Sequence, residues 1–210
     1  MPSVPVSLAV LVSGEGSNLQ ALIDDSSDDF SISVVISDRP DVEGPARARA
    51  AGIPAVVVDW ADFGSRADFT SAVCDAAEDS GAQGLILAGF MRILAPVAME
   101  RFPDAIINVH PALLPSFPGA HAVEHALAYG VTVTGVTVHF VDEQVDHGPI
   151  IRQRPVPVLH GDDASSLHER IQTIEHQLLP EVVAAFGRGD LSVEGRQVRW
   201  NSTANAGGSQ

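Results

Sequence analysis

The residues best suited to chemistry stand at the end of a short apolar segment, where Asn108 and His110 flank Val109. In a strand, residues two positions apart face the same side, so Asn108 and His110 project together while Val109 points away. Two hydrogen-bonding side chains at the end of a buried strand need partners, which neighbouring backbone or a ligand can supply. For a lone histidine the backbone is the default, but the pairing with asparagine makes the two interpretations nearly equal.

An amide beside an imidazole suits acyl transfer, for example the attack of an amine on a formyl carbonyl. Such an attack forms a tetrahedral oxyanion, to which an amide N–H and an imidazolium can both donate. The imidazole can also return a proton to the leaving nitrogen. A nearby carboxylate would raise the pKa of His110 from about 6.5, and the best candidate is Asp146, in the loop 142–149. Acidic loop residues are usually only solvated, so this role depends on Asp146 meeting Asn108 and His110.

A glycine-bearing turn, Ser13–Leu19, follows the first apolar segment and opens a predicted helix. Glycine lets the backbone approach a ligand closely, and the free N–H groups at a helix start point at an anion. Leu19 replaces the third glycine of a dinucleotide fingerprint and no lysine follows, so the turn suits a single phosphate. On the turn alone, a plain connection with Ser17 or Asn18 as N-cap is about as good an interpretation. Its place at the carboxyl end of the first strand favours phosphate.

A competing metal hypothesis comes from His121, Glu124 and His125, which match the H-x-x-E-H zinc pattern. That site needs both histidines on one helical face and a third ligand. Nothing marks a third ligand, and short patterns arise readily in a chain with eight histidines. We therefore predict no metal, with His121 near the functional site and His125 on a helix surface.

The elements that must position these groups alternate between strands and helices. Near-continuous apolar strands separated by helices indicate a parallel sheet covered on both faces. The connection between the last two long strands is too short for a crossover helix, so they should pair antiparallel. The sequence thus predicts an α/β, Rossmann-like, mostly parallel sheet flanked by helices, with an antiparallel strand pair near the C-terminus. Strands are predicted at Val4–Val12, Phe30–Ser37, Ala55–Val58, Gly84–Ala88, Ile106–His110, Val133–Phe140 and Ile150–Val158, helices at Asn18–Asp25, Gly44–Ala51, Arg66–Ser80 and Ala164–Phe186, and a short hairpin at Leu191–Trp200.

Composition narrows the classes of partner. Twelve basic against 27 acidic residues give a net charge of −15, which repels nucleic acid and anionic membranes. The N-terminus does not resemble a signal peptide and no apolar run reaches the ~20 residues of a membrane span, so we expect a soluble, cytoplasmic protein. The one cysteine, Cys74, suits a reducing compartment and is interpreted as a packed small hydrophobe.

Together these motifs resemble the phosphoribosylglycinamide formyltransferases, the folate-dependent enzymes of purine synthesis. Each motif alone is unspecific, but their order and spacing match over nearly the whole chain. The matching segments are Ser13–Gln20, Ala88–Leu94, Ile107–Pro118, Val136–Pro149 and Arg170–His176. The resemblance implies a single formyltransferase domain over residues 1–200. The small polar residues 201–210 predict a disordered tail.

The resemblance also implies roles for the candidate catalytic residues. His110 corresponds to the proton donor, Asn108 to an oxyanion partner, and Asp146 to the group that raises the pKa of His110. His121 and His139 match family positions near the site, with roles left open.

The substrate-binding residues are implied in the same way. Gly16, Ser17 and Asn18 correspond to the binding site for the phosphate of the ribosyl glycinamide. Gln172 and Glu175, three apart on one helical face, would help to bind that substrate. The residues implied to bind folate are Arg66, Met91, Arg92, Ile93, Leu94, Asn108, Val141 and Asp142.

The implied reaction moves a formyl group from 10-formyltetrahydrofolate, as co-substrate, to the glycyl amine of 5'-phosphoribosylglycinamide, with no metal and no ATP. The partners are then these small molecules, with no nucleic acid and no membrane. Folds of this family are compatible with a weak homodimer, which the sequence leaves open. Two residues depart from many relatives: Ala112 stands where serine is common, and His147 where glycine is often found. His147 leaves the conformation of its loop and the pH response open.

Three alternatives remain. Enzymes that formylate initiator methionyl-tRNA resemble the same core but are longer and need a tRNA-binding domain, which the acidic charge disfavours. Formyl-folate hydrolases resemble it too, typically with an extra N-terminal regulatory domain. A non-catalytic mononucleotide-binding module would use only the glycine turn, and would leave Asn108, His110 and Asp146 without a shared purpose.

Overall fold

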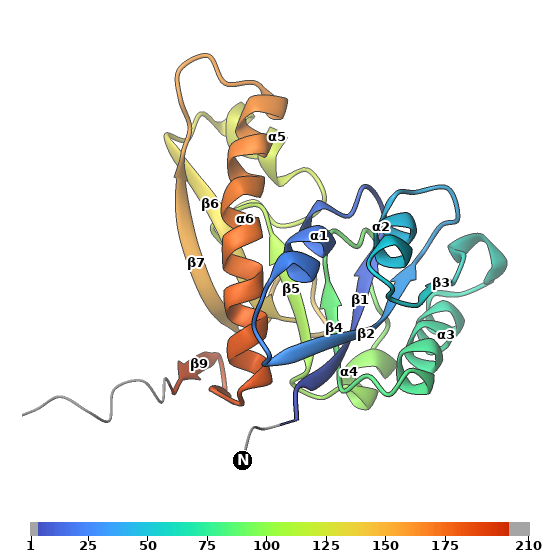
Figure 1. The fold of residues 1–210 in the computed structure, drawn as a ribbon. Coiled ribbons are helices and arrows are strands. Elements are labelled where there is room, and N and C mark those ends of the chain that lie inside the picture. Colours follow the sequence, from blue (N-terminus) through green and yellow to red (C-terminus); the bar gives the residue numbers. More distant parts are fainter. Residues whose placement is uncertain (1–3, 202–210) are drawn as a thin grey trace, which may run out of the picture.

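The computed structural model describes residues 4–201, which form a nine-stranded sheet flanked by helices (Figure 1). The strand order is β3-β2-β1-β4-β5-β6-β7-β9-β8. The strands are β1 (Val6–Val12), β2 (Phe30–Ser37), β3 (Ala55–Val57), β4 (Gly84–Leu87), β5 (Ile106–His110), β6 (Val133–Phe140), β7 (Ile150–Pro157), β8 (Leu191–Glu194) and β9 (Gln197–Trp200). The helices are α1 (Ser17–Asp24), α2 (Gly44–Ala50), the 3-10 helix η1 (Trp60–Asp62), α3 (Arg66–Asp79), α4 (Val97–Arg101), α5 (Ala122–Tyr129) and α6 (Ala164–Gly187).

The strands from β1 to β5 pair in parallel and carry a core on each face. In β1, Leu8 and Val10 pack into one hydrophobic cluster and Ala9 and Leu11 into the other, as the two-residue period of a strand requires. Helices α1, α2, α5 and α6 contribute to the first cluster, and α3 and α4 to the second. The parallel strands are therefore buried on both sides, and their carboxyl ends are left to form a site.

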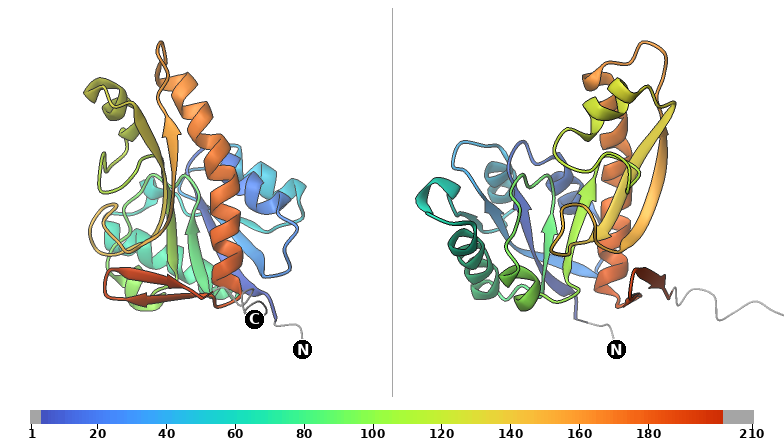
Figure 2. Two further views of the ribbon diagram at one scale, coloured as in Figure 1. Left: turned by 90° about the vertical axis from the view of Figure 1, so that its left-hand side faces the viewer. Right: turned by 180° about the vertical axis from the view of Figure 1, so that it is seen from behind.

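Beyond β5 the pairing changes direction. β6 pairs antiparallel with both β5 and β7, and β8 and β9 form an antiparallel hairpin joined to β7 through a parallel bridge between Ile150 and Gln197. Figure 2 shows this C-terminal hairpin, in red, at the amino end of the sheet beside the lower end of α6. The loop that joins β6 to β7 carries Asp146 back toward the end of β5.

The predicted fold class is confirmed: a mostly parallel sheet flanked by helices, with an antiparallel pair near the C-terminus. All seven predicted strands and the hairpin occur within two residues of their predicted bounds; β1 begins at Val6 rather than Val4, and β3, β4 and β7 each end one residue early. Three short elements, η1, α4 and α5, had no predicted range. Residues 202–210 of the predicted disordered tail lie outside the described residues. Within residues 4–201, no helix is both long and apolar enough to cross a membrane.

Candidate functional site

The end of β5 presents Asn108 and His110 together, as the strand period predicts. His110 is almost fully buried, with 4% of its surface exposed. In the neighbouring antiparallel strand β6, His139 lies opposite Asn108, and the side-chain amide nitrogen of Asn108 lies 3.2 Å from His139 Nε2. The His139 Nδ1 atom lies 2.7 Å from the carbonyl oxygen of Phe140. With Nδ1 directed at this carbonyl, the Nε2 atom faces the Asn108 amide and the Asp146 carboxylate.

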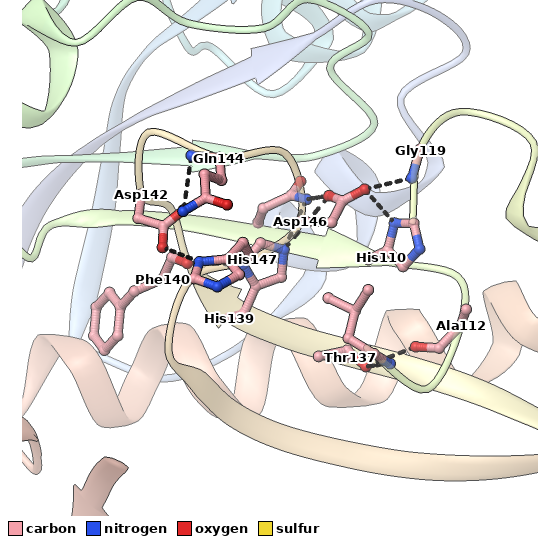
Figure 3. A network of polar contacts seen from close by, with 12 residues as sticks. His110, Ala112, Gly119, Thr137, His139, Phe140, Asp142, Gln144, Asp146 and His147 are labelled. Atoms are coloured by element: carbon pink, nitrogen blue, oxygen red, sulfur yellow. Dashed lines mark hydrogen bonds and ion pairs between the residues drawn. The ribbon is translucent and has the colours of Figure 1, made fainter. Parts of the chain in front are cut away.

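The carboxylate of Asp146 closes this cluster from the β6–β7 loop (Figure 3). Asp146 Oδ2 lies 3.4 Å from His110 Nδ1 and accepts a 2.7 Å hydrogen bond from the backbone N–H of Gly119. Asp146 Oδ1 lies 3.4 Å from the Asn108 amide nitrogen. Three side chains from two separate segments, β5 and the β6–β7 loop, therefore meet, which is the meeting of Asn108, His110 and Asp146 that the sequence predicts.

The pKa of His110 shifts in the opposite direction to the sequence prediction. Burial lowers the pKa of His110 below its ordinary value of 6.5, and this outweighs the raising effects of the Asp146 carboxylate and the Phe117 carbonyl. Asp146 thus acts in the predicted direction but does not reverse the net shift, because the imidazole is nearly removed from water. The His110 ring nevertheless faces an acceptor at each nitrogen, since Nε2 lies 2.8 Å from the Phe117 carbonyl oxygen. Only the charged ring can donate to both.

Asp146 is held as a carboxylate. Burial raises its pKa, but contacts from His139, the Gly119 amide and His110 outweigh this effect and bring the pKa below 3.8. The backbone of Asp146 has φ 51°, in the left-handed region that a side chain rarely adopts. The surrounding contacts must stabilise this conformation, as is common where a site needs a side chain in one direction.

The cluster lies in the wall of a cavity of about 300 Å³. The lining residues are Leu87, Gly89–Leu94, Asn108–Pro111, Gly119, Ala120, His139 and Val141–Asp146. All the residues predicted to bind folate are among them except Arg66. Arg66 is exposed at the first turn of α3, and its folate role stays a prediction without support from the cavity.

Arg92 lines the cavity but is already committed to an ion pair. Its Nε lies 2.6 Å from Asp38 Oδ2, and its guanidinium lies 5.0 Å from the centre of the Trp60 ring. Asp38 is buried at the carboxyl end of β2, where the sequence could have marked it as a polar residue directly after an apolar strand. The Phe117 carbonyl and the Gly119 amide were also missed, because backbone groups carry no signature of residue type.

The predicted phosphate site and its partner helix meet at the start of α1. Gly16 precedes the helix with φ 78°, and Ser17 and Asn18 occupy its first turn. From α6, the Gln172 side-chain amide donates to Ser17 Oγ at 3.4 Å, and Glu175 accepts from the Asn18 amide at 2.8 Å. The two groups of residues predicted to bind the same substrate are therefore in direct contact.

The Asn18–Glu175 pair is buried and incompletely satisfied. Asn18 and Glu175 are 7% and 4% exposed, and burial raises the pKa of Glu175 above its ordinary value. The Asn18 carbonyl oxygen Oδ1 has no hydrogen-bond partner among residues 4–201. A buried oxygen without a partner costs stability, so this pair suits a polar ligand that arrives with hydroxyl donors.

A larger, open hollow of about 710 Å³ lies between α1 and α6 and includes Ser17. Four acidic residues line it against one arginine: Glu15, Asp24, Asp25, Glu181 and Arg47. Arg47 is itself 3.2 Å from Glu15. Such a lining repels an anion, so despite its size this hollow is a poorer phosphate site than the backbone at Gly16.

The two histidines of the zinc hypothesis lie close together at the start of α5. His121 is the N-cap of α5, and its carbonyl oxygen accepts from the backbone N–H of His125, so the two rings lie together with their centres 6.2 Å apart. His121 does not line the cavity, and 72% of its side chain is exposed; its expected position near the site is not supported. Within the described part of the chain, no group of three or more histidine, cysteine, aspartate or glutamate residues could hold a metal ion.

Comparison with known proteins identifies the family of this chain. A family model described as formyl transferase matches residues 6–183. Phosphoribosylglycinamide formyltransferase of Mycobacterium tuberculosis is 45% identical over 93% of this chain and 91% of its own length, and that of Escherichia coli is 37% identical over 90% of each. The crystal structure of glycinamide ribonucleotide transformylase 1 from Symbiobacterium toebii superposes with a TM-score of 0.91 at 44% identity, covering 94% of this chain and 95% of that one. The chain therefore belongs to the formyl transferase family.

Proposed function

We propose that this protein transfers a formyl group from 10-formyltetrahydrofolate to the glycyl amine of 5'-phosphoribosylglycinamide, in purine biosynthesis. The observation that carries the proposal is the meeting of Asn108, His110 and Asp146 in the wall of a cavity bounded by the segments 89–94 and 141–146. The relatives named above support it, since their names specify formyl transfer to phosphoribosylglycinamide.

The reaction needs a bond between the amine nitrogen and the formyl carbon, and cleavage of the bond between that carbon and the folate nitrogen. Negative charge gathers on the formyl oxygen in between, and the amine proton must reach the folate nitrogen. The Asn108 amide has only long contacts, at 3.2 and 3.4 Å, so an oxyanion can compete for its hydrogens. His110 is the group to hold the proton in transit.

The lowered pKa of His110 fits this task. A neutral imidazole is ready to accept the amine proton when attack occurs. The forming oxyanion then adds a second negative charge beside Asp146, and this stabilises the imidazolium. Asp146 orients the ring through Nδ1 and remains a carboxylate throughout, because its own pKa is low.

The phosphate end of the acceptor is proposed to bind at Gly16, Ser17 and Asn18. Both sites lie at carboxyl ends of parallel strands, and β1 and β5 are separated only by β4. Two strand spacings amount to roughly 10 Å. An extended phosphoribosyl glycinamide can bridge such a gap, with Gln172 and Glu175 contacting its middle.

The direct test is an assay with 10-formyltetrahydrofolate and phosphoribosylglycinamide, without ATP or added metal, that follows the deformylated folate. We expect turnover that depends on the acceptor. Release of formate at the same rate without acceptor would instead indicate a hydrolase, and binding of both ligands without turnover would indicate a binding module.

The catalytic roles predict a specific pattern in variants. His110→Ala and Asp146→Asn should each lower kcat by roughly 10²-fold or more, the usual range for loss of a general acid–base group. The KM for phosphoribosylglycinamide should change little, because its phosphate site is two strands away. Glu169→Ala, on the exposed face of α6, is the control. Near-normal turnover in both catalytic variants would disprove the assigned roles.

A further inference from the structure

The β6–β7 loop, which carries Asp146, is tied to the C-terminal hairpin by a chain of polar contacts. His147 Nδ1 lies 2.7 Å from Asp142 Oδ2, and the other oxygen of Asp142 accepts from the backbone N–H of Gln144 (Figure 3). Arg196, in the turn of the C-terminal hairpin, donates from Nη2 to the His147 carbonyl oxygen at 2.7 Å. Its Nη1 lies 3.3 and 3.2 Å from the two ring nitrogens of His147.

The hairpin that supplies Arg196 has its own attachment to the sheet. Ile150, at the end of the same loop, bridges to Gln197 in β9, and the Arg152 guanidinium lies 4.1 Å from the centre of the Trp200 ring. Arg196 is thus presented to the loop from a fixed element. The hairpin lies beyond residue 183, where the match to the family model ends, so this support comes from outside the matched segment.

The loop needs such support because one of its residues has a disfavoured backbone conformation. Asp146 has φ 51°, in the left-handed region that is unfavourable for a residue with a side chain. Its side chain is nevertheless directed inward at His110 and the Gly119 amide, while Val145 beside it is 48% exposed. The contacts with His110 and Gly119 fix the carboxylate, and the Asp142–His147–Arg196 chain ties the loop to the C-terminal hairpin. At the start of the loop, the Val141 N–H also donates to the Ile106 carbonyl.

We propose that Arg196 and His147 are positioning residues for the formyl transfer. Acting through Asp142, they hold the 141–147 segment in the shape that aims Asp146 at His110 and forms the folate-facing wall before any substrate binds. Neither residue lines the cavity, so they act through the loop alone. Preorganisation of this kind lowers the ordering cost of binding and keeps the reacting groups aligned. The inference rests on the proposed function.

The first test is kinetic. Arg196→Ala and His147→Ala should each lower kcat/KM for 10-formyltetrahydrofolate by on the order of tenfold, with the KM for phosphoribosylglycinamide unchanged. The double variant should lose less than the sum of the two single variants, because their contacts belong to one chain. Arg196→Lys should recover part of the loss through the His147 carbonyl, a backbone contact. The matched control is Arg199→Ala, which removes an exposed pair with Glu194 inside the same hairpin and should leave all constants unchanged. Fully additive losses, or equal losses in the control, would overturn the proposal.

The second test does not depend on activity. Hydrogen–deuterium exchange of the amides in residues 141–148 should become faster in Arg196→Ala and His147→Ala than in the parent or in Arg199→Ala, with equal Tm values within about 2 °C. Unchanged exchange would overturn the positioning role even if the parent protein proved inactive. An inactive parent with the expected change in exchange would remove the proposed function and leave the loop support standing.

Discussion

At the scale of single residues, the site combines groups whose environments push their pKa values apart. Burial lowers the pKa of His110, contacts with donors lower that of Asp146, and burial raises that of Glu175. Near neutral pH this arrangement gives an imidazole that can accept a proton beside a carboxylate that stays charged. Opposed shifts in one site are typical of acid–base chemistry.

Glu175 allows a test in which stability and function move in opposite directions. Its pKa is higher in the folded than in the unfolded chain, so its carboxyl stabilises the fold fully below the unfolded value near 4.5, and this contribution is lost as the pH rises through the folded value. Glu175→Gln keeps an acceptor for Asn18 and removes the buried charge. We expect a higher Tm than the parent at pH 7, a difference that closes below pH 4.5, and a raised KM for phosphoribosylglycinamide. Differential scanning fluorimetry across pH measures the first two. A Tm difference that does not vary with pH would contradict the assignment.

At the scale of elements, the site depends on turns that return the chain to the ends of β1 and β5. The Ser13 side chain accepts from the Met91 backbone N–H at 2.8 Å, and the Ser13 N–H donates to the Gly89 carbonyl at 3.1 Å. The phosphate turn and the cavity wall are therefore tied together. On the other side, buried Thr137 in β6 donates to the Ala112 carbonyl and accepts from the Leu114 N–H, which holds the segment after β5 against the sheet.

At the base of the β6–β7 loop, we predict that Gly148 does not tolerate a side chain. A Cβ on Gly148 would lie 1.8 Å from the Phe140 carbonyl oxygen, so the backbone must move to accept any side chain. Gly148→Ala should lower the free energy of unfolding by about 1–3 kcal/mol and reduce kcat, because the shift reaches Asp146 two residues away. Urea denaturation and the formyl-transfer assay measure the two effects. Gly64→Ala, where a Cβ meets nothing within 4 Å, is the control, and equal behaviour of the two variants would contradict the steric account.

At the scale of the whole molecule, two hydrophobic clusters hold the sheet between its helical layers. The second cluster includes Cys74, which is fully buried in α3. Burial raises the pKa of its thiol to about 11, so the thiol is both inaccessible and un-ionised near neutral pH. Its environment is that of a packed small hydrophobe, in agreement with the sequence interpretation.

This burial makes Cys74 a reporter of cooperative unfolding. Under native conditions at pH 8, we expect a disulfide-exchange reagent to modify the thiol only at the rate of opening of the α3–sheet core. Modification should become immediate above the urea midpoint that circular dichroism gives. Stoichiometric labelling within seconds in native buffer would contradict the described packing. Because Cys74 is the one cysteine, no second thiol complicates the measurement.

The sequence by itself determined the fold class, the antiparallel return near the C-terminus and the joint projection of Asn108 and His110, whereas most of the other groups around the cavity were named only through the family resemblance. The features that it determined follow from local rules: the two-residue period that pairs Asn108 with His110, the glycine turn before α1, and apolar runs that must be buried on both faces. Leu19 stands in place of the third glycine of a dinucleotide fingerprint, and this local feature alone favoured binding of a single phosphate.

Only the tertiary structure decided how these groups interact. The net pKa of His110 depends on how much water the surrounding segments exclude, and the exposure of His121 depends on where α5 begins. The contacts of Asp146 with the Gly119 amide and of Arg92 with Asp38 join residues 27 and 54 positions apart. The Arg196–His147 contact spans 49 positions. Such pairings arise from packing of distant segments, which no local pattern of residue types encodes.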